Sequence, residues 1–427
     1  MFWFDFAWDI QHVLNQWWWQ INFLLLIVFV LLIRLTWKKP INGLALTIVL
    51  LPTYLIRSQI WFLPFTYLEI CIWAVFLTWF IKNLTTKNSL QYFSNPYRAP
   101  IILIIIAATI SLFISPEVRQ AAGLWKAYFI EPIMLFTVAA NTIKNKSDKE
   151  TILWALGLST LTISLLAIYQ KFSAFGIFQP AWVASDHRRV TSIFSSPNAV
   201  GLYLGPIIIL YSTWIINDFK KIKATVLKFI IMLPALLAVW FTVSQGTWLG
   251  LAAATVFLAF FGWDKKKTIL LVIAGGLILF ATPVIREKAW PILTFADASG
   301  QNRLILISMS ADYLGTSAKN FLLGAGILGF ADIQNQLRDP LKLEALLYPH
   351  NIVLNFWLEI GLLGLIGFGW IIAKFYYKGL KQLQASPDWI TLGVLAAMIT
   401  VLIHGLIDVP YFKNDLAVLF WLIVALL

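Results

Sequence analysis

The sequence predicts an all-α membrane protein, a polytopic helical bundle of about 12 or 13 transmembrane spans with one large outer loop that contains short helices. Hydrophobic residues make up 60% of the 427 positions and charged residues 12%, whereas soluble domains carry roughly 25% charged residues. The apolar residues form runs long enough to cross a hydrocarbon core about 30 Å thick as helices. The basic residues gather in short clusters between these runs. We therefore expect residues 1–427 to form a single transmembrane domain.

The apolar runs place the spans in chain order. The expected spans are residues 20–37, 41–56, 60–81, 99–115, 120–141, 151–170, 198–217, 226–244, 247–262, 268–284, 350–373, 389–406 and 412–427. The run at 41–56 is short for a span. The aromatic opening, residues 1–20, is typical of an interfacial belt rather than of a cleaved signal peptide.

Basic clusters occupy every second connection, and the positive-inside rule makes those connections cytoplasmic. The clusters are Arg34/Lys38/Lys39, Lys82/Lys87/Arg98, Lys144/Lys146/Lys149, Lys220/Lys221/Lys223, Lys265/Lys266/Lys267 and Lys374/Lys378/Lys381. The long polar connections, residues 171–197 and 285–349, then lie on the outer side. The C-terminus lies inside, and the side of the N-terminus depends on the exact number of spans.

Several kinds of chemistry are excluded by absent motifs. The sequence has no phosphate-loop motif, no dinucleotide-binding glycine fingerprint and no D-x-D signature, so no cytoplasmic nucleotide site is expected. The formal charge of +12 follows the topology clusters, so no nucleic-acid partner is expected. The histidines, at positions 12, 187, 350 and 404, never fall at ligand spacing, and Cys71 is alone. We therefore expect no metal site and no other cofactor.

The first candidate site is the outer loop that reads RRVTSIFSSPN. Ser195 or Ser196 is an expected N-cap, with Pro197 at the first helical position. Arg188 and Arg189 precede it. A helix N-terminus and a guanidinium fork together suit a phosphate oxygen. The alternative is that these arginines contact lipid headgroups.

The second candidate lies in NRLILISMSADYL, where Asn302 is an expected cap and Arg303 falls in the first helical turn. A positive side chain there opposes the helix dipole, which favours an anion facing it. The alternative is an ion pair with Asp297 or Asp312. Further on, the glycines of segment 322–330 indicate a turn that packs close to another element.

The third candidate is HNIVLNFWLEIGLLG. His350 lies at the outer mouth of a span, and Asn351, Asn355 and Glu359 recur at a spacing of four, which predicts a polar stripe facing the bundle interior. An imidazole has an unperturbed pKa near 6.5 and suits removal of a proton from a sugar hydroxyl. A structural interfacial histidine is the alternative.

Two further polar pairs are less specific. Lys126 and Glu131 lie in one predicted span, where they either pair with each other or contribute to substrate binding. His404 and Asp408 lie at an outer helix end, where they either orient a neighbour or close the bundle.

Over roughly residues 120–427 the chain resembles the O-antigen ligase and O-antigen polymerase superfamily of bacterial surface-polysaccharide enzymes. The similar segments are RRVTSIFSSPNAVGLYL, SQGTWLGL, NRLILISMSADYL with LLGAGILGF, and HNIVLNFWLEIGLLG, in that order. The resemblance implies a metal-independent glycosyltransferase that takes a glycan from undecaprenyl pyrophosphate. It assigns pyrophosphate binding to Arg189 and Arg303, and catalysis to His350. SQGTWLGL has Gln245 where the family often has arginine.

The residues and the resemblance agree on a multi-pass enzyme of the bacterial cytoplasmic (inner) membrane that transfers a glycan to an acceptor hydroxyl on the outer face. Its expected partners are the lipid-linked donor, membrane lipids, and a glycan, lipid or protein acceptor. Arg188 is a further candidate for pyrophosphate binding. Candidate supporting residues are Asn198, Asn351, Glu359 and Lys126. The alternative function is a transporter or flippase of lipid-linked saccharides, for which inverted repeats and a charged site near the midplane are expected.

Overall fold

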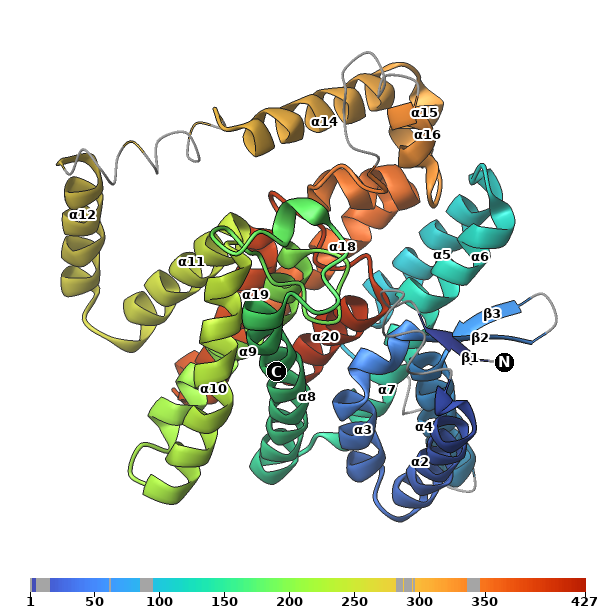
Figure 1. Cartoon of the computed structure of the whole chain (residues 1–427), viewed down its shortest axis with the longest axis horizontal. Helices are drawn as coiled ribbons and strands as arrows, with labels where there is room; N and C mark the ends of the chain where they lie inside the picture. The colour runs from blue at the N-terminus through green and yellow to red at the C-terminus, as the bar shows by residue number, and fades with distance from the viewer. Residues whose placement is uncertain are drawn as a thin grey trace. The chain divides into compact units, whose positions relative to one another are not determined.

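The computed structural model describes residues 2–4, 16–60, 63–84, 95–281, 287, 294, 296–335 and 346–427. The chain folds into two compact units, whose elements are labelled in Figure 1. Unit 1 comprises Met1–Arg98, Lys126–Ser244 and Tyr411–Leu427, and unit 2 comprises Ala99–Trp125 and Gln245–Pro410. Parts of the predicted belt over residues 1–20 and of the predicted outer loop 285–349, together with Lys87, lie outside the described residues.

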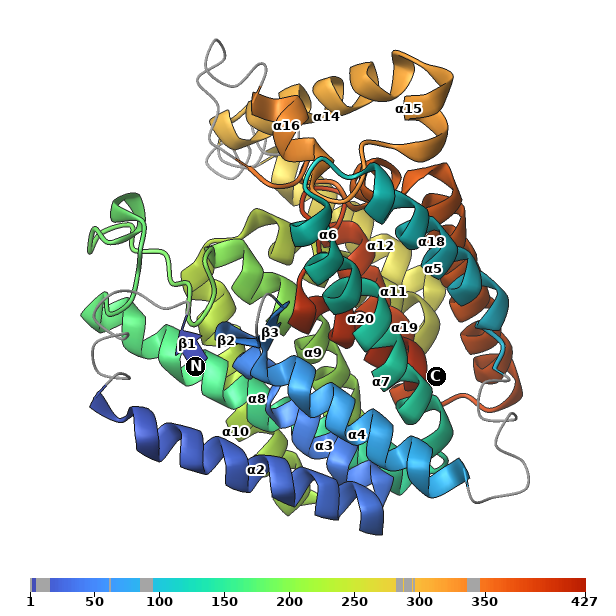
Figure 2. The same ribbon diagram turned by 90° about the vertical axis from the view of Figure 1, so that its right-hand side faces the viewer.

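Unit 1 is mainly helical, with a small sheet near its start (Figure 2). Its elements are β1 (Phe2–Phe4), α2 (Trp18–Lys38), α3 (Pro40–Val49), a 3-10 helix (Leu51–Leu55), β2 (Ile56–Ile60), β3 (Leu63–Thr66), α4 (Tyr67–Leu84), a π-helix (Lys126–Ile130), α7 (Glu131–Thr142), α8 (Lys146–Ser173), a second 3-10 helix (Pro180–Trp182), α9 (Pro197–Asn217), α10 (Ile222–Thr242) and α20 (Asn414–Ala425).

The small sheet corrects two predicted spans. Strands β1, β2 and β3 pair antiparallel in that order, in a stretch where helices over 41–56 and 60–81 were expected. Leu63 precedes Pro64, and a residue before proline is pushed out of the helical region toward extended backbone, whereas Leu51 and Pro52 begin a 3-10 helix directly after α3. Helix α3 ends at Val49, and α4 does not begin until Tyr67.

Helix α9 is the central helix of unit 1, because nearly all of its residues are buried. A helix that is apolar on all sides needs neighbours all round. It packs against α8, where the Tyr211 hydroxyl donates to the Leu153 carbonyl at 2.8 Å and the Ser159 and Tyr203 hydroxyls lie 2.6 Å apart. The N-terminus of α9 is thereby held in a fixed position.

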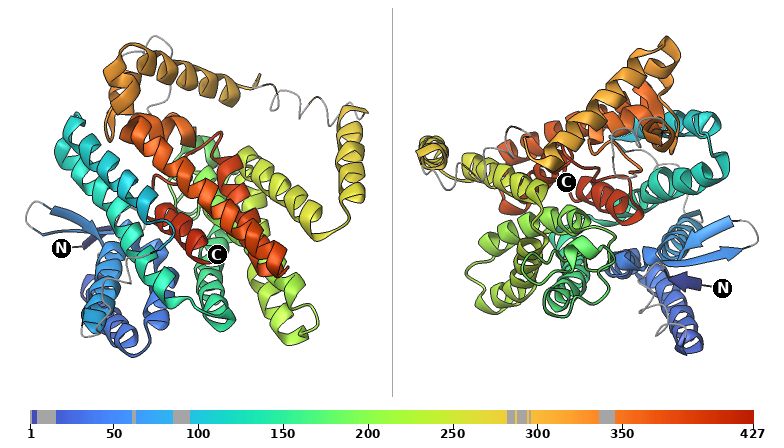
Figure 3. Two further views of the ribbon diagram at one scale, coloured as in Figure 1. Left: turned by 180° about the vertical axis from the view of Figure 1, so that it is seen from behind. Right: turned by 45° about the horizontal axis from the view of Figure 1, so that its top comes forward.

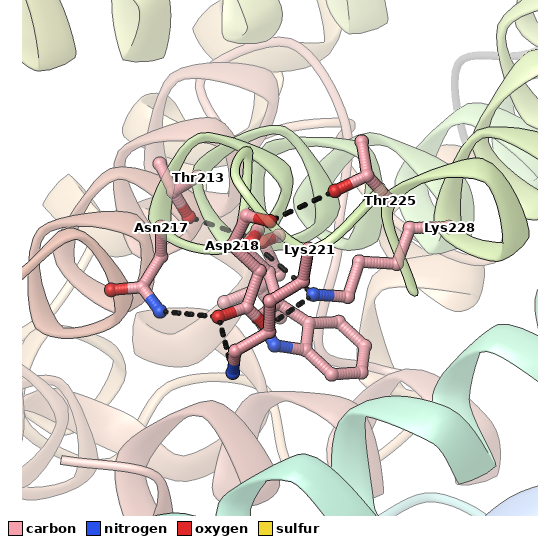
Figure 4. A network of polar contacts seen from close by, with 8 residues as sticks. Thr213, Asn217, Asp218, Lys221, Thr225 and Lys228 are labelled. Carbon is pink, nitrogen blue, oxygen red and sulfur yellow. Dashed lines mark hydrogen bonds and ion pairs between the residues drawn. The ribbon is translucent and has the colours of Figure 1, made fainter. Parts of the chain in front are cut away.

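A polar network joins the other end of α9 to α10 (Figure 4). The Asp218 carboxylate accepts from Lys228 Nζ at 2.7 Å and from Lys221 Nζ at 3.1 Å. Lys228 is fully buried, and its ammonium lies 3.9 Å from the ring centroid of Trp214. Burial raises the pKa of Asp218, but the hydrogen bonds and charges of the two lysines outweigh burial and leave the pKa below its ordinary value. The network fixes the turn between the two helices.

Among the described residues of unit 2, all the elements of secondary structure are helices. Its elements are α5 (Arg98–Ile114), α6 (Val118–Trp125), α11 (Gln245–Gly262), α12 (Lys265–Ala281), α14 (Ala298–Gly315), α15 (Ala318–Leu323), α16 (Gly329–Asn335), α18 (Ile352–Ala385) and α19 (Trp389–His404). Helices α14 to α16 gather at one end of this unit (Figure 3). They are the short helices predicted for the large loop.

Helix α18 is broken near its start. Ile360 leaves the helical region and Gly361 has φ +70°, a backbone conformation that glycine tolerates and other residues rarely adopt. A Cβ at Gly361 would lie 2.6 Å from the Leu322 carbonyl oxygen, so glycine is also required by close packing. Residues 352–359 form a short first piece. Residues 362–385 then extend about 36 Å at 1.5 Å per residue, which exceeds a hydrocarbon core of about 30 Å.

The fold class predicted from the sequence is confirmed. Within the described residues, seven helices are long and apolar enough to cross a membrane, and four shorter helices are also apolar. The shorter ones are Pro40–Val49, Arg98–Ile114, Trp389–His404 and Asn414–Ala425. The total of about 12 or 13 crossings stays a prediction.

Candidate active site

His350 is held in a defined position at the start of α18. Its backbone is left-handed, with φ +51°. The next residue, Asn351, caps α18, and its side-chain amide also donates to the Leu406 carbonyl at 2.9 Å. The Ile352 N–H donates to the Gly405 carbonyl at 2.6 Å. These contacts attach the His350 segment to the turn that follows α19.

Asp408 in that turn is the partner of His350. The imidazole Nδ1 lies 3.2 Å from Asp408 Oδ1, which also accepts from the Val409 N–H at 2.8 Å. The Asp408 side chain is buried, while that of His350 is 28% exposed. Burial raises the pKa of Asp408, but the adjacent His350 outweighs burial, by charge and by hydrogen bond, and holds the pKa below its usual range. The carboxylate can fix the tautomer with hydrogen on Nδ1, which leaves Nε2 as the basic atom.

The predicted start of the helix that carries Arg303 is wrong. Asn302 was expected as the cap, but α14 begins at Ala298 and Asp297 is its N-cap, since the Asp297 carboxylate accepts from the Gly300 N–H at 3.3 Å. Arg303 therefore lies in the second turn, beyond the range in which the helix dipole disfavours a positive charge. The helix dipole therefore gives no reason to expect an anion facing Arg303.

The surroundings of Arg303 still favour an anionic ligand. Neither expected acidic partner takes its guanidinium: Asp297 caps α14, and Asp312 Oδ2 lies 3.4 Å from the Ser308 hydroxyl. Among the described residues, none is recorded in an ion pair or hydrogen bond with Arg303. Arg303 is close enough to His404 for their charges to interact. The side chain thus combines a positive charge with unused donors beside the turn that carries Asp408.

The glycines of segment 322–330 pack as the sequence indicated. Gly324 and Gly326 both have positive φ, at +72° and +86°. A Cβ at Gly324 would lie 2.3 Å from the Leu358 carbonyl oxygen, and one at Gly326 would lie 2.9 Å from the backbone of Ser115. The Ala325 N–H donates to the same Leu358 carbonyl at 2.7 Å. The segment therefore docks directly on the short first piece of α18.

The predicted polar stripe of α18 is buried. Asn355 is 0% and Glu359 1% exposed. Glu359 Oε2 accepts from the Leu328 N–H at 3.1 Å, which ties the glycine segment to α18. Glu359 Oε1 and both polar atoms of the Asn355 amide have no hydrogen-bond partner among the described residues. Asn351 differs from these two, because it caps the helix instead of lining the interior.

Arg189 in unit 1 contacts the N-terminal turn of α9. Ser196 is the N-cap, as predicted, and its hydroxyl accepts from the Ala199 N–H at 3.3 Å. Arg189 Nε donates to the Thr242 carbonyl at 2.8 Å, and its Nη2 lies 3.4 Å from Asn198 Oδ1. The guanidinium and the helix N-terminus are thus neighbours, which is the combination that suits a phosphate group.

Arg188 has a different environment from Arg189. Its Nε donates to the Val183 carbonyl at 2.9 Å and its Nη1 to the Lys171 carbonyl at 2.8 Å. The Lys171 ammonium in turn donates to the Arg188 carbonyl at 2.9 Å. These contacts organise the loop between α8 and α9.

Lys126 forms ion pairs. Its ammonium contacts the Glu69 carboxylate closely and lies 3.7 Å from Glu131 Oε1. The Trp73 indole donates to Glu131 at 2.9 Å, and the Asn414 amide donates to Glu69 at 3.0 Å. The structure thus favours pairing over substrate binding for Lys126. Its main partner, Glu69, was not apparent from the sequence because it lies 57 residues away.

The candidate residues divide between the two units. Unit 1 holds Arg188, Arg189, Asn198 and Lys126, and unit 2 holds Arg303, His350, Asn351, Glu359 and Asp408. Within the part of the chain that the structure describes, no group of three or more His, Cys, Asp or Glu side chains has the arrangement to hold a metal ion.

Residues 200–369 match the protein family described as O-Antigen ligase. No curated protein matches the chain. The matched segment runs from α9 into α18 and contains Arg303, His350, Asn351 and Glu359, whereas Arg189 precedes it and Asp408 follows it. The match confirms the resemblance to the O-antigen ligase and polymerase superfamily that the sequence motifs indicated. Over residues 200–369, the chain is similar to the O-antigen ligase family.

Proposed function

We propose that this protein is a membrane glycosyltransferase that moves a glycan from an undecaprenyl-pyrophosphate donor to an acceptor hydroxyl on the outer face of the bacterial cytoplasmic membrane. The observation that carries the proposal is the His350–Asp408 pair, 3.2 Å apart, in the unit that also carries Arg303. A buried carboxylate behind a half-exposed imidazole is an arrangement that supports general-base catalysis. The family match supports transfer of the ligase or polymerase type.

In this proposal His350 is the catalytic base. Its Nε2 takes the proton of the acceptor hydroxyl while Asp408 stabilises the imidazolium that forms. The acceptor oxygen forms a bond to the anomeric carbon, and the bond from that carbon to the pyrophosphate oxygen breaks. The products are the glycosylated acceptor and undecaprenyl pyrophosphate.

The arginines act on the leaving group. Arg189 and Arg303 offset the negative charge that develops on the departing pyrophosphate, and guanidinium forks suit phosphate oxygens geometrically. Asn198 supports Arg189, with which it shares a 3.4 Å contact. Arg188 organises the loop that presents Arg189. Because two guanidinium groups supply the counter-charge, we expect transfer to proceed without a divalent metal or other cofactor.

The transport alternative has one structural argument in its favour. Helix α18 is broken, and the buried polar atoms of Asn355 and Glu359 lie next to the break. Broken helices with polar groups at the break form the substrate sites of many transporters. The two functions differ in their product, since only a transferase joins the glycan covalently to an acceptor.

The deciding experiment is transfer in vitro. The full chain in nanodiscs receives a synthetic undecaprenyl-pyrophosphate glycan with lipid A core, a second lipid-linked glycan or a peptide as acceptor, with and without EDTA. We expect a covalent product with one acceptor class and equal rates in both conditions. Movement of the glycan lipid without any product supports the transport alternative. Loss of transfer in EDTA that a divalent ion restores contradicts metal independence.

The same transfer assay, carried out with variants of His350, tests whether this residue is the catalytic base. His350→Ala should reduce turnover by roughly 100-fold or more while donor binding stays near that of the parent. Because His350 has φ +51°, His350→Asn is the better-tolerated companion, since asparagine adopts left-handed backbone more readily than alanine. His187→Ala is the matched control, because that histidine is 74% exposed and pairs only locally with Asp186. Near-parent transfer by folded His350 variants refutes the assignment.

A further inference from the structure

A cavity of about 320 Å³ lies in unit 2, where α11 and α18 end and α19 begins. Its walls are mainly apolar, with Phe261, Leu380, Leu383 and Trp389 among the side chains that line it. The Trp389 ring lies against the backbone of Gly262, where an added Cβ would be 2.5 Å from the ring. The volume lies at the lower end of the roughly 300–1,000 Å³ range of small-molecule sites. An aliphatic chain suits such walls.

Lysines follow the wall residues of this cavity closely in the chain. Lys265, Lys266 and Lys267 begin α12 a few residues after α11 ends, and all three are exposed. Lys265 Nζ lies 5.2 Å from the Phe260 ring, whose centroid is 5.3 Å from that of Phe261 in the cavity wall. Phe260 and Phe261 thus link Lys265, the first residue of α12, to the cavity wall.

A second positive side chain comes from α18, and the nearby acidic groups are engaged. Lys381 is exposed and directly follows the wall residue Leu380. Asp388 accepts from the Ile390 and Thr391 N–H groups at 2.9 Å and so caps α19, where the helix dipole offsets its charge. Asp264 similarly accepts from the Lys267 N–H at 2.9 Å. Asp388 itself lines the cavity, but the N–H groups of Ile390 and Thr391 bind its carboxylate, which leaves the nearby lysines as donors for an anion.

We propose that this cavity binds an anionic phospholipid, with part of an acyl chain between Leu380, Leu383 and Trp389 and the phosphate near Lys265 and Lys381. The basic loops predict that this end of the helices faces the cytoplasm, where anionic lipids give the membrane surface its negative potential. A tryptophan at the rim suits the interface between headgroups and acyl chains. The site is separate from the proposed glycosyl transfer, which uses the opposite face.

The test is lipid binding to the full-length protein, measured by native mass spectrometry after titration with phosphatidylglycerol or phosphatidylcholine. We expect phosphatidylglycerol to bind more tightly than phosphatidylcholine. Replacing one lysine should weaken its binding about fivefold, which corresponds to the roughly 1 kcal/mol of a basic side chain near an anionic membrane surface. The double variant Lys265→Gln/Lys381→Gln should weaken it about 30-fold if the two contributions add.

Two matched controls separate this site from general charge and from added bulk. Lys220→Gln/Lys223→Gln removes the same charge from exposed positions in the α9–α10 region of unit 1 and should leave affinity unchanged. Leu383→Trp fills the cavity and should displace the lipid.

Leu270→Trp is the control for bulk, because Leu270 is 66% exposed on α12, and it should not displace the lipid. Equal binding of the two lipids overturns the proposal, as does an equal loss of affinity in the two lysine pairs. If Leu383→Trp fails to fold, the lysine pairs still decide the question.

Discussion

Replacing Asp408 by asparagine tests whether the His350–Asp408 contact serves transfer. Asparagine has nearly the same shape but no charge, and its side chain can present an N–H where the parent presents only oxygens. At 3.2 Å, and with a buried carboxylate, the parent contact becomes a charge-assisted hydrogen bond when His350 takes up a proton. Such bonds contribute about 1.5–3 kcal/mol. Since 1.36 kcal/mol is a factor of ten in rate, Asp408→Asn should slow transfer by roughly 10- to 150-fold.

The pH dependence gives a second, independent readout. The pKa of Asp408 is lowered, so the carboxylate is ionised at neutral and mildly acidic pH and its support of the imidazolium is lost only as the pH falls through that lowered pKa. The parent should therefore keep the contact over the whole range of a practical assay. In Asp408→Asn the amide no longer favours protonated imidazole, so the acid limb of the rate profile should move to lower pH.

The assay is the initial rate of transfer from the synthetic lipid-linked donor between pH 5 and pH 9. Asp312→Asn is the matched control, because Asp312 is exposed and its side chain lies 3.4 Å from the Ser308 hydroxyl, away from His350 in the chain. It should keep the parent's rate and profile. A folded Asp408→Asn protein with a rate within twofold of the parent and an unmoved acid limb would refute the reasoning.

Three further outcomes are expected. Arg189→Ala and Arg303→Ala should each weaken donor binding and slow transfer, with lysine restoring only part of both because it loses the bidentate fork; parent-like binding of labelled donor by both variants contradicts this. Gly324→Ala should lower stability by about 1–3 kcal/mol because of its left-handed backbone, whereas Gly315→Ala has open space around its Cβ and should keep the parent's Tm; equal melting curves argue against the docking role. Ser299→Cys should react with an impermeant thiol reagent in intact cells, and protection until lysis overturns the predicted topology.

The sequence predicted the structure best where a feature depends on residues that are close together in the chain. Long apolar runs predicted the helical membrane fold, and the start of α9 was predicted from Ser196 and Pro197 because a cap and a first-turn proline are local signals. Local reasoning was wrong for residues 56–60 and 63–66, which form strands and contain Pro64 and several polar residues. It was also wrong for Asn302, since Asp297 upstream is an equally good cap with a partner in reach.

The partners of the candidate side chains were not readable from the sequence. Asp408 lies 58 residues from His350 and Glu69 lies 57 residues from Lys126, so only the folded chain brings each pair together. Asp408 had one signal, an acidic residue in the turn after a buried span, but that pattern does not identify which neighbour it contacts. The buried state of Asn355 and Glu359 was predictable, because polar residues at helical spacing in an apolar helix face protein.

The break at Gly361 also defines a boundary for protein engineering. The glycine segment is joined to the short piece before the break by the contact of Leu328 with Glu359 and by that of Ala325 with Leu358. Exchanging residues 285–349 alone between related enzymes would separate both pairs of partners and leave His350 on a foreign support. A cassette that ends at Ile360 transfers the loop together with the helix piece on which it rests. Acceptor preference should therefore move between chimeras only when the exchanged segment includes that piece.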